Sequence, residues 1–225
     1  MAVYNGELFL REQLDSILPQ LNTADEMVIS DDGSTDQTLE IIKSYCDPRI
    51  RVLPTKIFGN PNGNFEYALS HCHNEIIFLA DQDDIWHSHK IQIMTDELAS
   101  CDLALCDCRL IDQAGKVKLP SFFEWNGSQR GVVKNIVKNS FVGCCMAFHR
   151  KLLKKILPFP ATVSIHDQWI GLVALRYFNV SFLPIILVDH RKHGGNYSST
   201  GSQSQNSWGK KVISRFRLVK ALINP

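Results

Sequence analysis

Two short apolar runs, each ending abruptly in acidic residues, constrain the fold of this chain more than any other feature. The first run, 27–29, leads into Asp31 and Asp32; the second, 76–80, leads into the acidic segment 81–84, which reads Asp-Gln-Asp-Asp. Short buried strands that alternate with helical patterns predict an α/β fold, with a mainly parallel central sheet covered by helices on both faces. Because ligands of such sheets bind outside the carboxyl ends of the strands, we expect both acidic groups at one ligand-binding edge.

The same alternation continues along the rest of the chain. Helices are expected over 10–21, from 34 onward, and over 65–73, 89–98, 150–157 and 166–178. Further strands are expected over 50–53, 103–106, 141–148 and 185–188. A stretch rich in Pro, Gly, Ser and Asn at 120–128 predicts a loop, and the Ser- and Gly-rich stretch 197–207 predicts a mobile loop or linker.

Composition narrows the class of protein. The 225 residues carry a formal net charge of +1, which gives no sign of a nucleic-acid binder. No apolar run approaches the ~20 residues of a membrane-spanning helix, and the start of the chain lacks the pattern of a signal peptide. A cytoplasmic protein is therefore expected.

The seven cysteines are expected to be buried, reduced thiols rather than a disulfide framework. A zinc site built from Cys101, Cys106 and Cys108 is the alternative, with His71 and His73 upstream. The spacing of these residues matches none of the usual paired Cys-x-x-Cys patterns, which favours the buried thiols.

Asp81, Asp83 and Asp84 bring three carboxylates to the end of one strand. Two unit charges ~4 Å apart repel each other by about 4 kcal/mol at an effective dielectric constant of ~20, so a counter-charge is expected. Mg²⁺ typically binds one or two carboxylates together with substrate phosphates. The alternative is a solvated acidic turn, which the expected second acidic pair at the same edge makes less favourable.

Asp31 and Asp32 allow two interpretations. They are either turn and helix-capping carboxylates, or acceptors of hydrogen bonds from a nucleobase or ribose. Their spacing does not separate the two.

Six segments, in this order along the chain, carry a resemblance to a known family. They are MAVYNG at 1–6, ISDDGSTDQT at 29–38, FLADQDDIW at 78–86, GCCMAFHRKLL at 143–153, HDQWIGL at 166–172 and HRKHGGN at 190–196. The sequence resembles the family 2 glycosyltransferases, in particular their rhamnosyltransferase-like bacterial branch. The resemblance implies a GT-A fold over 1–200 with a Rossmann-like nucleotide-binding half. Family members normally begin with β-branched residues before the segment at Met1, so the first strand is expected to be truncated.

The resemblance also implies the donor and metal contacts. Ala2 and Tyr4 would line the base pocket, and Asp31 and Asp32 would contact the base and ribose. The metal ligands would be Asp83 and Asp81 of the DXD signature, with Asp81 nearer the ribose or sugar, and His193. The expected ion is Mg²⁺ or Mn²⁺.

Asp167 matches the position of the catalytic base, although an acidic residue in the first turn of a helix also complements the helix dipole. His166 would either tune Asp167 or cap the helix. Asp84, Trp86, His166 and Trp169 would form the sugar or acceptor pocket, and the alternative for the two tryptophans is a place at the edge of the core.

The implied function is an inverting glycosyltransferase that moves a sugar from a nucleoside-diphosphate donor to a hydroxyl of a cell-surface polysaccharide or lipid-linked acceptor. L-rhamnose from dTDP-rhamnose is the first choice of donor. One alternative is a truncated, inactive nucleotide-sugar-binding module. A sugar nucleotidyltransferase is the other alternative, and the absence of a Gly-rich phosphate loop near the start of the chain argues against it.

The tail, 201–225, is expected to be a linker followed by a basic amphipathic helix. No Asp or Glu follows Asp189, and one helical face combines Val212, Phe216, Val219 and Ile223. The basic residues of the tail are Lys210, Lys211, Arg215, Arg217 and Lys220. Such a helix either rests on anionic lipid at the inner face of the cytoplasmic membrane or docks on the body of the protein.

Overall fold

Strand β2 (Met27–Asp31) is the centre of a parallel three-stranded sheet in the N-terminal half of the chain. All five of its residues are buried, as expected for a strand covered on both faces. It pairs with β1 (Ala2–Val3) on one side and with β3 (Ile50–Val52) on the other. The computed structural model describes residues 1–194 and 208–223, and within the last range the side chains from 213 onward.

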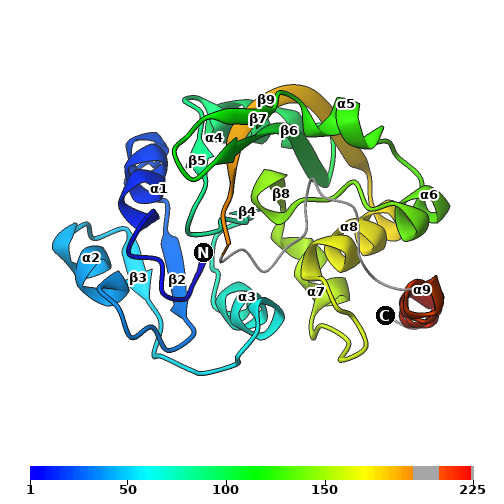
Figure 1. Cartoon of the computed structure of the whole chain (residues 1–225), viewed down its shortest axis with the longest axis horizontal. Coiled ribbons are helices and arrows are strands. Elements are labelled where there is room, and N and C mark those ends of the chain that lie inside the picture. Colours follow the sequence, from blue (N-terminus) through cyan, green and yellow to red (C-terminus); the bar gives the residue numbers. More distant parts are fainter. Residues whose placement is uncertain (195–207, 224–225) are drawn as a thin grey trace.

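Helices α1 (Leu10–Ile17), α2 (Thr38–Ser44) and α3 (Pro61–Ser70) surround this sheet (Figure 1). A short 3-10 turn, η1 (Leu18–Gln20), extends α1. The helices at 10–21, after 34 and at 65–73 are thus present near their expected places. Strand β1 is two residues long.

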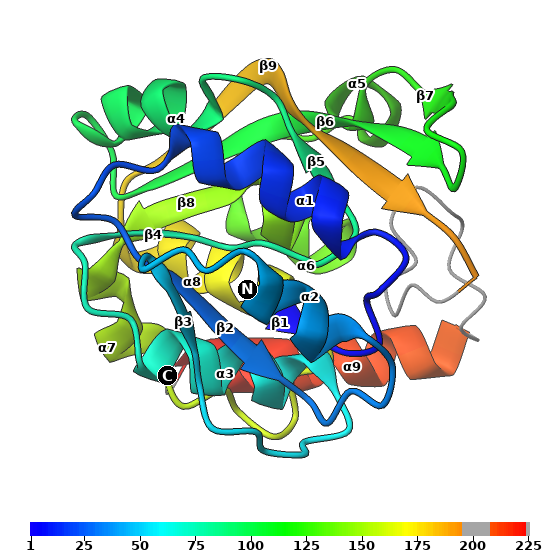
Figure 2. The same ribbon diagram turned by 90° about the vertical axis from the view of Figure 1, so that its left-hand side faces the viewer.

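A second, curled sheet forms the other half of the molecule (Figure 2). Its order is β4 (Ile76–Phe78), β8 (Met146–His149), β6 (Leu103–Asp112), β9 (Val180–Lys192) and β5 (Ile85–Trp86), and β7 (Val117–Leu119) pairs with β6. Strands β6 and β9 run parallel, and the other pairs of this sheet are antiparallel. The predicted α/β fold is confirmed. The three-stranded sheet is parallel as expected, whereas the second sheet is mixed rather than mainly parallel.

The remaining helices cover the second sheet and its ends. They are α4 (Lys90–Leu98), α5 (Phe122–Asn126), α6 (Val132–Val137), α7 (Leu153–Ile156), α8 (His166–Tyr177) and α9 (Trp208–Ile223), with 3-10 turns η2 (Gly143–Cys145) and η3 (Arg150–Leu152). The expected strand 141–148 is shorter, because η2 occupies its first part. The expected loop 120–128 contains α5, and the expected linker 197–207 lies outside the described residues.

The two halves share one apolar core, to which α1 contributes from the first half and β6 and β9 from the second. Helix α1 also bonds directly to the second sheet, where Ser16 Oγ accepts the Trp86 main-chain N–H at 3.0 Å. Among the described helices, none is both long enough and apolar enough to cross a bilayer.

Candidate active site

The acidic segment 81–84 lies after β4 and against the end of β9. Asp83 Oδ2 is 2.8 Å from His193 Nε2, and the carbonyl of Asp83 accepts a hydrogen bond from Arg191 Nε at 3.0 Å. Arg191 is buried and also pairs with Glu12 of α1. The end of β9 therefore holds the acidic segment and brings His193 to Asp83, although 110 residues separate these two in sequence.

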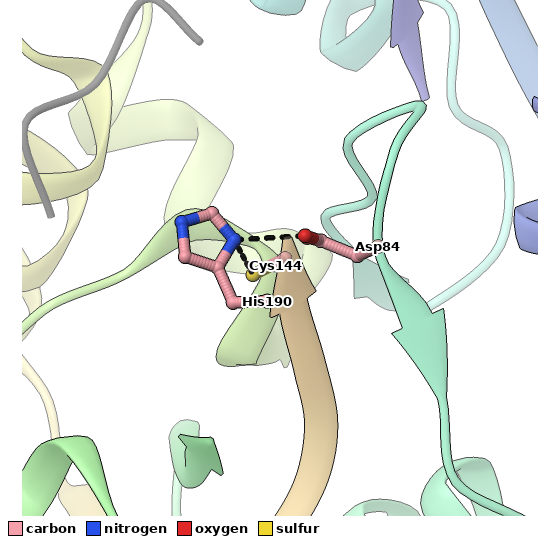
Figure 3. Close-up of side chains that lie close together, drawn as sticks. All are labelled: Asp84, Cys144 and His190. Atoms are coloured by element: carbon pink, nitrogen blue, oxygen red, sulfur yellow. Dashed lines mark hydrogen bonds and ion pairs between the residues drawn. The ribbon is translucent and has the colours of Figure 1, made fainter. Parts of the chain in front are cut away.

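Asp84 points the other way, into the protein. Its Oδ1 lies 2.8 Å from His190 Nδ1, and Cys144 Sγ lies 3.7 Å from the same nitrogen (Figure 3). Burial acts to raise the pKa of Asp84, but the charge of His190 and its hydrogen bond outweigh burial and hold this pKa below its usual range. Asp84 is fully buried, so the structure corrects its assignment to a sugar or acceptor pocket: it fastens β9 to the acidic segment.

Asp81 is the first residue of the acidic segment, and it lies among other negative charges. Burial first, and then the charges of Asp84, Asp83 and Asp167, raise the pKa of Asp81 to about 7. A carboxylate responds in this way only to charges that lie close to it. Contacts link the same two regions: Gly143 approaches Asp167, and the next residue, Cys144, contacts His190, which is bonded to Asp84.

Asp167 lies in the first turn of α8, and its neighbour His166 braces it. Asp167 Oδ1 is 2.6 Å from His166 Nε2, and the His166 ring stacks on Phe65 with a centroid distance of 4.3 Å. Burial acts to raise the pKa of Asp167, but the His166 charge, their close contact and the Gly143 N–H lower it below its usual value. The carboxylate is therefore ionised at neutral pH and able to take a proton.

Two residues that sequence reasoning did not single out support Asp167. Asn62, at the start of α3, accepts the His166 main-chain N–H at 3.0 Å across 104 residues of sequence. Gly143 provides the room for the base, since a Cβ at this position would lie 2.8 Å from Asp167 Oδ1. Gly143 stands in a family-like segment, whereas Asn62 stands in a turn-rich stretch that gave no chemical signal.

The predicted base-pocket residues lie at the same edge of the molecule. Ala2 is half-buried in β1, and Tyr4 just after it is exposed. Asp31 accepts the N–H groups of Gly33 and Ser34 at 3.0 and 3.1 Å. These bonds identify Asp31 as a turn carboxylate.

Asp32 ties the same edge to a later loop. Its Oδ1 accepts the N–H groups of Phe58 and Gly59, the latter at 3.1 Å, and its own N–H donates to Val3 O at 3.0 Å. The turn interpretation thus describes the contacts of Asp31, whereas Asp32 bonds a loop that is distant in sequence, and neither residue caps α2 or α3. Contact with a nucleoside stays a prediction for each.

The two tryptophans are core residues. Trp169 is 1% exposed, and its indole N–H donates to Ile156 O at 2.9 Å. Trp86 is also buried, with Lys90 Nζ 3.5 Å from its ring centroid. Their assignment to a sugar pocket is corrected accordingly, because both side chains are buried. His166 is buried too, but it contacts the predicted base.

Comparison with known proteins identifies the family of this chain. The model of a family described as "Glycosyl transferase family 2" matches residues 1–157. The chain belongs to this family. Its relatives include the dTDP-rhamnosyl transferase RfbG of Shigella flexneri, 39% identical over 43% of this chain and 36% of the relative. They also include the Escherichia coli UDP-Glc:alpha-D-GlcNAc-diphosphoundecaprenol beta-1,3-glucosyltransferase WfgD, 24% identical over 80% of this chain and 70% of the relative.

Solved structures show the fold. S. aureus TarS 1–349 in complex with UDP superposes with a TM-score of 0.72 at 21% identity, over 99% of this chain and 63% of that one. The mannosyltransferase PcManGT of Pyrobaculum calidifontis, in complex with GDP-Man and Mn²⁺, gives 0.64 at 16% identity over 100% and 63%. The predicted GT-A fold is confirmed. The chain spans only 36% of RfbG and 63% of the TarS chain.

Proposed function

We propose that this member of glycosyl transferase family 2 is an inverting glycosyltransferase that uses a nucleoside-diphosphate sugar. The observation that carries the proposal is the meeting of two groups at one edge of the molecule. Asp81 and Asp83 follow β4, and Asp167 lies in the first turn of α8. Gly143 approaches Asp167, and the next residue, Cys144, contacts His190, the partner of Asp84. A cluster of carboxylates next to an ionised base suits a reaction in which a diphosphate leaves and a hydroxyl attacks.

Asp167 acts as the general base. It takes the proton of the acceptor hydroxyl as the hydroxyl oxygen bonds to the anomeric carbon, and the bond from that carbon to the diphosphate breaks. A single displacement from the opposite face inverts the anomeric configuration. His166 and Asn62 hold the base in place, which supplies the positioning on which such a step depends.

A divalent cation, Mg²⁺ or Mn²⁺, fits the residues around Asp83. Carboxylate oxygens suit hard cations, and an imidazole nitrogen is a common ligand of transition metals. Asp83 and His193 would hold the ion, with Asp81 beside them. Burial first, and then the neighbouring carboxylates, raise the pKa of Asp81, and a cation would offset both effects. When bound, the ion stabilises the negative charge of the departing diphosphate as a Lewis acid.

The family relationship and the nucleotide complexes of TarS and PcManGT support a nucleotide-sugar donor. We propose dTDP-L-rhamnose as the first choice, supported by the partial similarity to RfbG. Ala2, Tyr4, Asp31 and Asp32 would contact the nucleoside at the edge where β1 and β2 end.

The proposed acceptor is a hydroxyl of a cell-surface polysaccharide or of a lipid-linked saccharide, and no nucleic acid takes part. The diphosphoundecaprenol acceptor in the name of WfgD supports the lipid-linked class. Such an acceptor would place the reaction at the cytoplasmic face of a membrane, with peripheral contact through the C-terminal helix of the proposed tail unit 201–225.

The test is a screen of donor consumption with Mn²⁺ or Mg²⁺ over dTDP-rhamnose, UDP-glucose and UDP-N-acetylglucosamine. We expect metal-dependent release of nucleoside diphosphate from dTDP-rhamnose. Asp167→Asn should lower the rate about 10²- to 10⁴-fold while donor binding in calorimetry is retained. Asp102→Asn, at an exposed ion pair with Lys151, is the matched control and should leave the rate unchanged. Donor binding without turnover of any donor would instead identify an inactive binding module.

A further inference from the structure

Helix α9 has two apolar faces, and only one of them is buried. Leu218 and Leu222 pack into the core, with 4% and 3% of their surface exposed. Phe216 is 70% exposed, and Ile213 and Ile223 are more than half exposed. At about 100° per residue these three lie on the side of the helix away from the two leucines. The helix therefore docks on the body of the protein and still presents a second apolar face to solvent.

Neighbouring helices extend this exposed face. Val133 and Val137 of α6 are 75% and 57% exposed, and Trp125 of α5 is 44% exposed. Arg215 Nη2 donates to Val137 O at 2.7 Å, which joins α9 to α6. Lys138 Nζ lies 5.7 Å from the Trp125 ring centroid, which joins α6 to α5.

Figure 1 shows α5, α6 and α9 along one side of the molecule. We call their exposed apolar surface the lateral strip; its members are Trp125, Val133, Val137, Ile213, Phe216 and Ile223.

The lateral strip has a basic border. Lys134 of α6, Lys138 directly after α6, and Arg217 and Lys220 of α9 are exposed beside it, with Glu124 of α5 as an acidic neighbour. Exposed apolar strips of this kind mark interaction surfaces. The combination of aliphatic side chains, a tryptophan and a cationic border matches the surface of an anionic bilayer, where apolar side chains enter the headgroup boundary and cations meet lipid phosphates.

Helix α6 links the lateral strip to the proposed base. Its buried Asn135 gives its main-chain carbonyl to Gln168 Nε2 at 2.7 Å, and Gln168 follows Asp167 directly. The outer side of α6 therefore belongs to the lateral strip, and its inner side touches the start of α8. A membrane under the strip would lie on the flank of the molecule nearest to this contact.

We propose that the lateral strip rests on the surface of an anionic bilayer and so orients the base toward lipid-borne acceptors. The orientation toward an acceptor rests on the proposed glycosyltransferase function, whereas the binding to lipid does not. The proposed partner of the strip is the lipid surface itself. Leu218 and Leu222 hold α9 on the body of the protein, so that its other apolar face can contact the lipid.

Sedimentation of the full chain with vesicles tests the proposal. We expect binding to vesicles of phosphatidylglycerol and phosphatidylcholine, loss of binding to pure phosphatidylcholine, and weaker binding at higher salt. The double variant Val133→Ser/Phe216→Ser should lower the partition coefficient about tenfold or more. Arg217→Gln/Lys220→Gln should lower it about 30-fold. Ile185→Ser, an exposed apolar residue of β9 outside the strip, is the control and should bind like the parent.

Equal binding of the parent and the Val133→Ser/Phe216→Ser variant would overturn the proposal, and so would equal binding to neutral and anionic vesicles. A dimer in light scattering that this variant dissociates would also overturn it, because the strip would then be an interface between copies. Donor consumption without vesicles is measured in parallel. We expect the strip variants to consume the donor at the rate of the parent. If the parent itself consumes no donor, the proposed function is contradicted, and the vesicle experiment still decides whether the strip binds lipid.

Discussion

The side-chain amide of Gln82 pairs with the main chain of Tyr4 in both directions. The Tyr4 N–H donates to Gln82 Oε1 at 2.7 Å, and Gln82 Nε2 donates to Tyr4 O at 2.9 Å. A Cβ at Gly6 would lie 2.6 Å from Gln82 Oε1, so the glycine leaves room for this pairing. The middle residue of the DXD signature therefore couples the proposed metal site to the proposed base pocket.

Replacing Gln82 with alanine should uncouple these two sites. If Tyr4 contacts the donor as proposed, the loss of these two hydrogen bonds should lower kcat/KM for the donor about tenfold or more, mainly through KM. Steady-state kinetics with varied donor measures this effect. Gln92→Ala is the matched control, since Gln92 is exposed on α4 and bonds to Asp96 of the same helix. An unchanged KM in Gln82→Ala would contradict the coupling.

Gly143→Ala should disable the base through steric displacement alone. The new methyl group would lie 2.8 Å from Asp167 Oδ1, so the carboxylate must move. A misplacement of about 1 Å in a catalytic group costs about 10²-fold in rate. The measurement is turnover in a double-mutant cycle with Asp167→Asn. Because both changes act on the same group, the double variant should be no slower than Asp167→Asn alone. Additive losses would mean that Gly143 acts elsewhere.

His193→Ala should weaken manganese binding in the presence of a nucleoside diphosphate. Its Nε2 faces Asp83 Oδ2 at 2.8 Å, where both groups could contact one ion, so we expect an affinity loss of about tenfold or more. The free Mn²⁺ signal in electron paramagnetic resonance measures it. His73→Ala is the control, because His73 is largely exposed beside Glu26. Equal affinity in the His193 variant and the parent would remove His193 from the site.

Glu26→Gln should lower stability at pH 7 and have less effect in acid. Burial acts to raise the pKa of Glu26, but bonds from Arg51 and from the His73 N–H outweigh burial and lower it. A lowered carboxyl pKa gives stability that is present above the unfolded pKa of about 4.3 and is lost as pH falls through the folded pKa.

For a pair this exposed the effect is at most about 1 kcal/mol, or roughly 2–4 °C in melting temperature. Melting curves of both proteins from pH 7 to pH 3 test the prediction. A difference that grows on acidification would have the wrong sign for it.

Local patterns predicted most of the elements, because periodicity along one segment reports its own burial. The runs 27–29 and 76–80 lie in or overlap β2 and β4, and the stripe at 166–178 matches α8 (His166–Tyr177). The sequence patterns gave the wrong element where its conformation depends on residues that are distant in sequence. The expected strand 141–148 gives way to η2, where Gly143 must approach Asp167.

The order of motifs along the chain was enough to identify the family and the fold, and it gave Asp81, Asp83 and Asp167 as candidate site residues. The motifs did not predict in which direction each side chain points. Asp84 and Trp169 stand in the same motifs as the site residues, yet both turn inward.

The direction of a side chain depends on partners that are far away in sequence, such as His190 for Asp84 and Ile156 for Trp169. The supports of the site follow the same rule: Asn62 reaches His166, and Gln82 reaches Tyr4, only once the two halves of the chain have packed together. The sequence by itself thus determined the family and the candidate site residues. Long-range packing decided which of their polar side chains lie at the proposed site and which are buried in the core.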